Sequence, residues 1–124
     1  MSENAAQRAV VIGGASGIGW AVAKGLAAGG RQVTIADRDA DGAAQRAAEL
    51  GAPHDAAAVD VTDEAGVAAL FTRTGPIDIV VNTAGFGGFG RITEQSVEDF
   101  RAIVDCCLTG GFIVMKHGDE PGPR

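Results

Sequence analysis

Short apolar runs alternate with longer alanine-rich stretches along most of this chain. An apolar run of about four to six residues is typical of a strand buried in a parallel sheet. The pattern predicts four such strands, at Ala9–Ile12, Arg31–Ala36, about Ala56–Val59, and Ile77–Val81. Between them it predicts helices at Trp20–Ala27, Asp39–Leu50, Asp63–Thr72 with Thr62 as its cap, and Ser96–Gly110 with Ser96 as its cap. Strands that alternate with helices in this way indicate an α/β fold with a doubly wound parallel sheet.

A glycine-rich turn, Gly13-Gly14-Ala15-Ser16-Gly17-Ile18-Gly19, joins the first predicted strand to the first helix. Residues without a Cβ let the backbone turn tightly and approach a pyrophosphate, whose charge then sits on the free N–H groups at the helix N-terminus. The hydroxyl of Ser16 is a further donor. Because the chain has 19 glycines, a merely structural turn is the alternative.

An acidic residue, Asp37, directly follows the second predicted strand. It comes roughly 20 residues after the glycines, where a carboxylate accepts hydrogen bonds from the adenosine ribose hydroxyls. A solvated loop carboxylate is the alternative interpretation. Two more polar positions follow strands: Asp60, before Val61, and Asn82, in the sequence Asn82-Thr83-Ala84-Gly85.

Together these motifs resemble the short-chain dehydrogenase/reductase family, from about Arg8 to about His117. Its fingerprint is a Thr-Gly-x-x-x-Gly-x-Gly turn, an Asp after the third strand and Asn-Asn-Ala-Gly after the fourth. The resemblance implies a Rossmann fold with strand order 3-2-1-4, an NAD(P) cofactor and an oxidoreductase. It assigns the pyrophosphate to Gly13, Gly17, Ile18 and Gly19, the adenine ribose to Asp37, the adenine ring to Asp60 and Val61, and the inner cofactor wall to Asn82, Ala84 and Gly85.

Two positions depart from the fingerprint: Ile12 stands in place of the Thr, and Thr83 in place of the second Asn. Neither removes the site. Loss of the Thr hydroxyl is expected to remove a hydrogen bond between the first and fourth strands, worth about 1 kcal/mol.

The family's catalytic residues are a Ser, a Tyr-x-x-x-Lys and an Asn, and these 124 residues contain no tyrosine. The Asn position falls on Cys107, whose thiol is a weak donor that cannot replace an amide. We therefore expect a truncated or degenerate member that binds nucleotide without ordinary hydride transfer. One alternative is a non-redox enzyme, such as a cyclase or isomerase, in which Asp105 or Cys107 replaces the lost acid. Another is a binding or assembly protein.

Other side chains offer little further chemistry. The two histidines, His54 and His117, are expected to be exposed loop and helix-end residues, and no cluster has metal-ligand spacing. Cys106 and Cys107 are adjacent, with Cα atoms only about 3.8 Å apart, which is too close for an ordinary disulfide. A reduced, buried pair is expected.

Length and charge narrow the class of protein. The 124 residues predict one domain over residues 1–117 and a disordered Gly- and Pro-rich tail over 118–124. A net charge of −6 gives no basic surface for nucleic acid, and no apolar stretch is long enough to cross a membrane. No apolar signal core precedes Arg8, so with two unbridged cysteines we expect a cytoplasmic protein.

The cofactor is expected to be NAD rather than NADP, because Asp37 repels a 2′-phosphate, although Arg38 beside it partly offsets that charge. Binding is expected to be weak, since by the resemblance the residues that grip the nicotinamide ribose are absent. The apolar loop Phe86–Gly90 is either a substrate lip or simple packing. We also expect a homo-oligomer, joined through the edge of the strand Ile77–Val81 or the helix Val97–Leu108.

Overall fold

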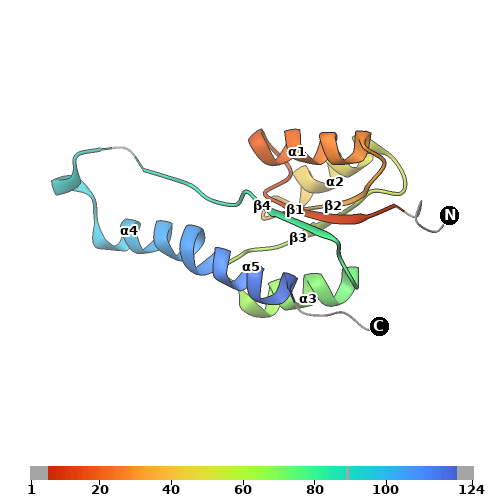
Figure 1. Cartoon of the computed structure of the whole chain (residues 1–124). Helices are drawn as coiled ribbons and strands as arrows, with labels where there is room; N and C mark the ends of the chain where they lie inside the picture. The colour runs from red at the N-terminus through yellow and green to blue at the C-terminus, as the bar shows by residue number, and fades with distance from the viewer. Residues whose placement is uncertain (1–5, 89, 120–124) are drawn as a thin grey trace.

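A computed structural model describes residues 6–88 and 90–119. Its core is a four-stranded parallel sheet in the order β3-β2-β1-β4, which confirms the predicted order. The sheet separates two helical layers, with α1 and α2 on one face and α3 and α5 on the other (Figure 1). The strands are β1 (Arg8–Ile12), β2 (Gln32–Asp37), β3 (Asp55–Ala58) and β4 (Ile79–Asn82).

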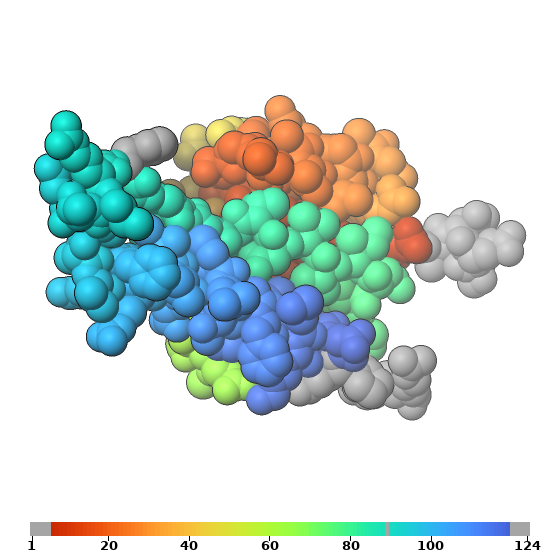
Figure 2. Space-filling model, turned by 60° about the vertical axis from the view of Figure 1, so that its left-hand side comes forward, coloured from red at the N-terminus to blue at the C-terminus, as the bar shows by residue number. Residues whose placement is uncertain are grey.

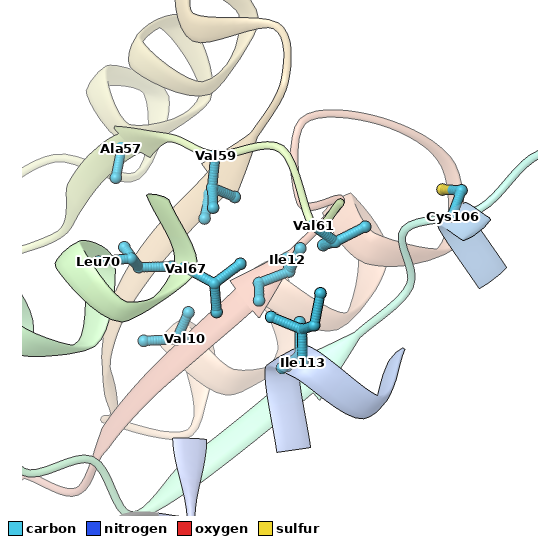
Figure 3. Packing of buried hydrophobic residues seen from close by; sticks show 11 residues of the cluster. Val10, Ile12, Ala57, Val59, Val61, Val67, Leu70, Cys106 and Ile113 are labelled. Atoms are coloured by element: carbon cyan, nitrogen blue, oxygen red, sulfur yellow. The ribbon is translucent and has the colours of Figure 1, made fainter. Parts of the chain in front are cut away.

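The central strand β1 supplies the core of both layers. Val11 packs with Val33 and Ile35 toward α1 and α2, whereas Val10 and Ile12 point to the opposite face. Successive side chains of a strand point to opposite faces, so an unbroken apolar run covers both. On the face of the sheet covered by α3 and α5, the side chains of Ile12, Val61, Val67 and Ile113 converge (Figure 3).

The first three helices are α1 (Gly17–Ala28), α2 (Ala40–Leu50) and α3 (Glu64–Thr74). Asp39 caps α2, where its carboxylate accepts a hydrogen bond from the Gly42 amide at 3.0 Å. The predicted Thr62 cap of α3 is wrong, because Asp63 is the N-cap and the Thr62 hydroxyl instead donates to Asp60 Oδ1 at 2.7 Å. A residue one position before the N-cap faces away from the free amides of the first turn, so Thr62 bonds backward.

The C-terminal helix is longer than predicted. After the short 3₁₀ turn η2 (Ile92–Glu94), α4 (Val97–Val104) continues through a π-helical segment, η3 (Asp105–Thr109), into α5 (Gly110–Gly118). Ser96 caps α4 as predicted, accepting from the Asp99 amide at 3.0 Å. The helix does not end at Gly110, which has helical dihedral angles of −60° and −40°. The predicted disordered tail lies outside the described residues from position 120 onward.

Gly110 allows this helix to approach the sheet closely. A Cβ at Gly110 would lie 2.6 Å from Val61 Cγ2, so a larger residue would push the helix outward. On the side of α5 that faces the sheet, Ile113 and Val114 are buried in the cluster that contains Ile12 and Val61. The opposite side of the helix is apolar and exposed. Its large side chains are Val97, Phe100, Leu108, Phe112 and Met115.

Strand β4 forms one edge of the sheet. It lies beside the C-terminal helix on the face shown in Figure 2, where the β4 segment is green and the helix blue. Within residues 6–88 and 90–119, no helix has the length and apolarity needed to cross a membrane.

Candidate nucleotide-binding site

A cavity of about 700 Å³ opens at the carboxyl ends of β1, β2 and β4. Ligands of doubly wound sheets bind at this edge, where the chain leaves neighbouring strands in opposite directions. The cavity is lined by Ile12, Gly13, Ser16, Gly17, Ile18, Gly19, Asp37, Arg38, Val59, Val61, Thr83, Ala84, Gly85, Phe86 and Cys106. Ten of the twelve predicted cofactor-binding residues are among these fifteen.

The glycine turn has the backbone geometry that its sequence predicted. Gly13 and Gly17 have positive φ angles of 80° and 57°, which side chains with a Cβ rarely adopt. The Gly13 amide donates to the carbonyl of Ala36 at 2.8 Å, which fixes the turn to the end of β2. Helix α1 then begins at Gly17, so the amides of its first turn have no partner within the helix. The arrangement presents N–H donors and the positive end of a helix dipole to the cavity, where an anion is stabilised.

Asp37 lies at the end of β2 and is fixed by two backbone amides. Its Oδ2 accepts from Ala15 N at 3.1 Å, and its Oδ1 accepts from Asp39 N at 3.0 Å. Each carboxylate oxygen has a second lone pair that can accept a bond from a ribose hydroxyl. Arg38 lines the same cavity next to this carboxylate.

Thr83 ties β4 to the glycine turn. Its hydroxyl donates to the carbonyl of Ile12 at 2.9 Å and lies 3.3 Å from the carbonyl oxygen of Gly13. The predicted loss of a tie between the first and fourth strands is therefore offset, because Thr83 supplies a hydroxyl that Ile12 lacks. Gly13 and Gly19 both need to be glycine here, since a Cβ on either would lie 2.6 Å from Thr83 Oγ1.

Two predicted residues, Asp60 and Asn82, do not line the cavity. The Asp60 carboxylate accepts from the Thr62 amide at 3.0 Å and from its hydroxyl at 2.7 Å. Both bonds hold the pKa of Asp60 below its usual value, and the bond from the Thr62 amide has the larger effect. Asn82 Oδ1 accepts a hydrogen bond from Ala84 N at 3.0 Å. This bond shapes the loop after β4, whose residues Thr83, Ala84 and Gly85 line the cavity.

The cavity also contains residues to which the sequence motifs gave no cofactor role: Ile12, Val59, Thr83, Phe86 and Cys106. Phe86 belongs to the loop that the sequence indicates to be either a substrate lip or simple packing. Val59 lies just past β3 and directly before Asp60 and Val61, the pair predicted to contact the adenine ring. This position in the sequence could have indicated Val59 as well. Cys106 comes from the π-helical segment, far along the sequence, and lies at one end of the buried cluster beyond Val61 (Figure 3). Only the tertiary packing brings it to the cavity.

The two cysteines do not form a buried pair. Cys106 is buried, and this burial raises the pKa of its thiol, whereas Cys107 is exposed, with its Sγ 3.6 Å from the carbonyl oxygen of Phe86. Neighbouring residues on a helix point about 100° apart, so only one of them can face the core. Both thiols are free, as predicted. Asp105 is exposed and lines a separate surface hollow with Phe100 and Thr109.

The histidines are also less exposed than predicted. His54 is partly buried, and its Nδ1 accepts from the Val33 amide at 3.0 Å. The side chain of His117 is only 12% exposed, and its Nε2 lies 2.8 Å from Glu64 Oε2. Both rings therefore join elements of the fold. Across the residues that the structure describes, no three His, Cys, Asp or Glu side chains are placed to hold a metal ion.

The sequence of residues 7–118 matches the family described as short chain dehydrogenase. One relative is the D-threitol dehydrogenase of Mycolicibacterium smegmatis, 37% identical over 87% of this chain and 44% of its own length. Another is named inactive 2-(S)-hydroxypropyl-CoM dehydrogenase 2, from Xanthobacter autotrophicus, and is 36% identical over 77% of this chain and 43% of its own length.

The fold is similar to that of a solved short chain dehydrogenase/reductase family protein. The two superpose with a TM-score of 0.85 at 33% identity, covering 90% of this chain and 48% of that one. The chain thus spans less than half the length of these relatives.

Proposed function

This chain belongs to the short-chain dehydrogenase family, and we propose that it binds the adenosine diphosphate half of a nicotinamide dinucleotide, with NAD as the dinucleotide. One observation carries the proposal: the N-terminus of α1 and the Asp37 carboxylate open onto the same cavity of about 700 Å³. This places donors for a pyrophosphate and an acceptor for a ribose diol in one site.

The described residues divide the work of binding. Amides at the start of α1, together with the Ser16 hydroxyl, hold the pyrophosphate, and Ser16 is suited to this because its side chain makes no capping hydrogen bond. Val59 and Val61 supply an apolar wall for the adenine ring. When bound, the nicotinamide of such a cofactor supplies or accepts a hydride; the residues of this chain bind and orient the adenosine end.

The preference for NAD rests on the charge of Asp37. A 2′-phosphate placed near this carboxylate would be repelled, whereas a free ribose diol donates to it. Arg38 lines the same cavity and reduces the preference for NAD without reversing it. The Asp37 carboxylate stays in place because two backbone amides donate hydrogen bonds to it.

We further propose that these 124 residues do not reduce carbonyl compounds by themselves, since they contain no tyrosine to donate the proton. The relative named inactive agrees with a member that lacks turnover. The non-redox alternative gains no support from Asp105, which lies in a different hollow from the nucleotide cavity. Free thiols at Cys106 and Cys107 favour a reducing compartment such as the cytoplasm.

Calorimetric titration of the 124-residue chain with ADP and with NAD tests the proposal. We expect saturable binding of both, with ADP nearly as tight as NAD, because the site contacts the half that they share. If NAD bound about a hundredfold tighter, worth about 2.7 kcal/mol, a nicotinamide site would exist that this proposal lacks. No binding of either ligand would refute the function.

Assembly is part of the proposed function. The C-terminal helix and the β4 segment lie beside one another on the face shown in Figure 2. The helix carries exposed apolar side chains, and β4 is an edge strand of the sheet. Both kinds of surface favour association, and we propose a homo-oligomer formed through this face.

A further inference from the structure

Arg46, on α2, reaches across to the glycine turn. Its Nε donates to the carbonyl of Ala15 at 3.0 Å, and its Nη1 pairs with Glu49 Oε2 at 3.0 Å. The guanidinium carbon lies 4.5 Å from the centre of the Trp20 ring. A planar guanidinium can make an in-plane bond, an ion pair and a stacking contact at once, which an ammonium cannot. Three contacts therefore fix this side chain, which is 33% exposed.

The Ala15 backbone is held from two sides. Its amide donates to Asp37 Oδ2 at 3.1 Å, at the end of β2, while its carbonyl accepts from Arg46 on α2. Helix α2 packs closely on the turn, because a Cβ at Gly42 would lie 3.4 Å from the Cβ of Ala15. The turn that begins the nucleotide site is thus clamped to two separate elements.

The clamp sets the direction of the next amide. The carbonyl of Ala15 and the N–H of Ser16 belong to one peptide unit, and in a trans peptide these two groups point in opposite directions. Because Arg46 holds the carbonyl, the Ser16 N–H points away from Arg46. Ser16 lines the cavity and Arg46 does not. Without the guanidinium, this peptide unit loses the hydrogen bond that fixes the direction of its carbonyl.

We infer that Arg46 is a positioning residue of the nucleotide site, which orients the Ala15–Ser16 peptide toward a bound pyrophosphate without touching the ligand. The inference rests on the proposed binding of a nucleotide. Trp20 and Glu49 hold the guanidinium in place, so α1 and α2 both contribute to the rigidity of the turn.

The test compares Arg46→Gln and Arg46→Lys with a matched control, Arg73→Gln. Arg73 also donates to a backbone carbonyl, that of Ala56, and pairs with a carboxylate, that of Asp55, but it lies away from the turn. The probe is ADP, titrated by calorimetry and followed at the Ser16 and Gly17 amides by two-dimensional NMR. We expect both Arg46 variants to bind ADP at least about tenfold more weakly, and the control to stay within about twofold of the wild type.

The NMR readout separates positioning from general destabilisation. In the wild type, ADP shifts the Ser16 and Gly17 amide signals; in the Arg46 variants these shifts are lost while Val61 and Ala84 still respond at high ADP. Arg46→Lys preserves the charge and the aliphatic stem, so it decides the matter if Arg46→Gln does not fold. ADP affinity within twofold of the wild type in a folded Arg46 variant overturns the role of Arg46 but leaves the proposed function intact. No ADP binding in the wild type overturns the proposed function, and the role of Arg46 with it.

Discussion

The hydroxyl of Thr83 lies 2.9 Å from the carbonyl oxygen of Ile12, at the point where β1 ends and the glycine turn begins. The Thr83 amide also donates to this oxygen, at 2.8 Å. One residue after β4 thus makes two bonds to the last residue of β1. The phosphate turn is in this way fixed from the side of β4, just as Asp37 and Arg46 fix it from the side of β2 and α2.

The first prediction concerns this tie. Thr83→Val preserves the shape of the side chain and removes its hydroxyl, so the partly buried bond to Ile12 is lost. We expect the free energy of unfolding to fall by about 1 kcal/mol, measured by urea denaturation. The control is Thr72→Val, at an exposed site on α3, which should change it by no more than about 0.5 kcal/mol. Equal effects of the two changes would show that the hydroxyl contributes no stability.

The second prediction separates two glycines of α1. A Cβ at Gly19 would collide with the backbone carbonyl oxygen of Gly13 and also lie 2.6 Å from Thr83 Oγ1, whereas one at Gly25 meets nothing within 4 Å. Gly19→Ala should therefore displace the start of the helix and abolish ADP binding in calorimetry. Gly25→Ala should leave binding intact and raise stability by about 0.5–1 kcal/mol, because alanine favours a helix over glycine. ADP binding by Gly19→Ala at wild-type strength would show that the turn does not hold the nucleotide.

Much of this site could be predicted from the sequence, because its residues are close to strand ends and carry distinctive types. Gly13, Asp37 and Ala84 each follow an apolar run, and parallel strands bring their carboxyl ends to one edge. Cys106 could not be found in this way. It reaches the cavity only because the helix continues past Gly110 and packs against Val61.

The exposure of Cys107 and the role of Thr83 were missed for related reasons. Exposure of one of two adjacent helical residues depends on which face is turned to the core, and this was not evident from the pair itself. In the sequence, Thr83 is only a departure from the family fingerprint. Its hydroxyl has a role only in relation to Ile12, 71 residues away in the sequence.

The third prediction is a pH dependence in the contact between α3 and α5. Glu64 Oε2 lies 2.8 Å from both Lys116 Nζ and His117 Nε2, and the hydrogen bond from Lys116 is the largest cause that lowers the pKa of Glu64 from its ordinary value of 4.5. A carboxyl whose native pKa is lowered stabilises the fold above its unfolded pKa. That stability is lost as pH falls through the native value.

We therefore expect Glu64→Gln to destabilise the protein near pH 7 and to have little effect near pH 3, in urea unfolding at both values. Glu98→Gln is the matched control, because Glu98 is exposed and also lies in the first turn of a helix. It should show no such difference. A Glu64→Gln effect that is as large at low pH as at neutral pH would contradict the contribution of the charge.

The fourth prediction is the choice of dinucleotide. Wild-type protein should bind NAD more tightly than NADP in calorimetry, and Asp37→Ser should shift the ratio toward NADP by about tenfold, since it removes a repulsive charge. Asp41→Ser, an exposed change in the first turn of α2, is the control and should leave the ratio unchanged. Tighter binding of NADP by the wild type would mean that Arg38 outweighs Asp37.

The last prediction is that the chain associates through its C-terminal helix. The side of this helix that carries Ile113 and Val114 is buried in the core, so the stripe of Phe100, Leu108 and Phe112 on the other side is left without cover, with each side chain 59–69% exposed.

Light scattering at micromolar concentration should give at least twice the chain mass of 12.5 kDa. Phe100→Glu with Leu108→Glu should reduce it to a single chain, because charges in an apolar contact remain unpaired. Lys24→Glu, an exposed change on α1 at the other face of the sheet, should leave the assembly intact. A wild-type protein that scatters as one chain would refute this association, whereas an assembly that survives the double change would place the contact at the edge of β4.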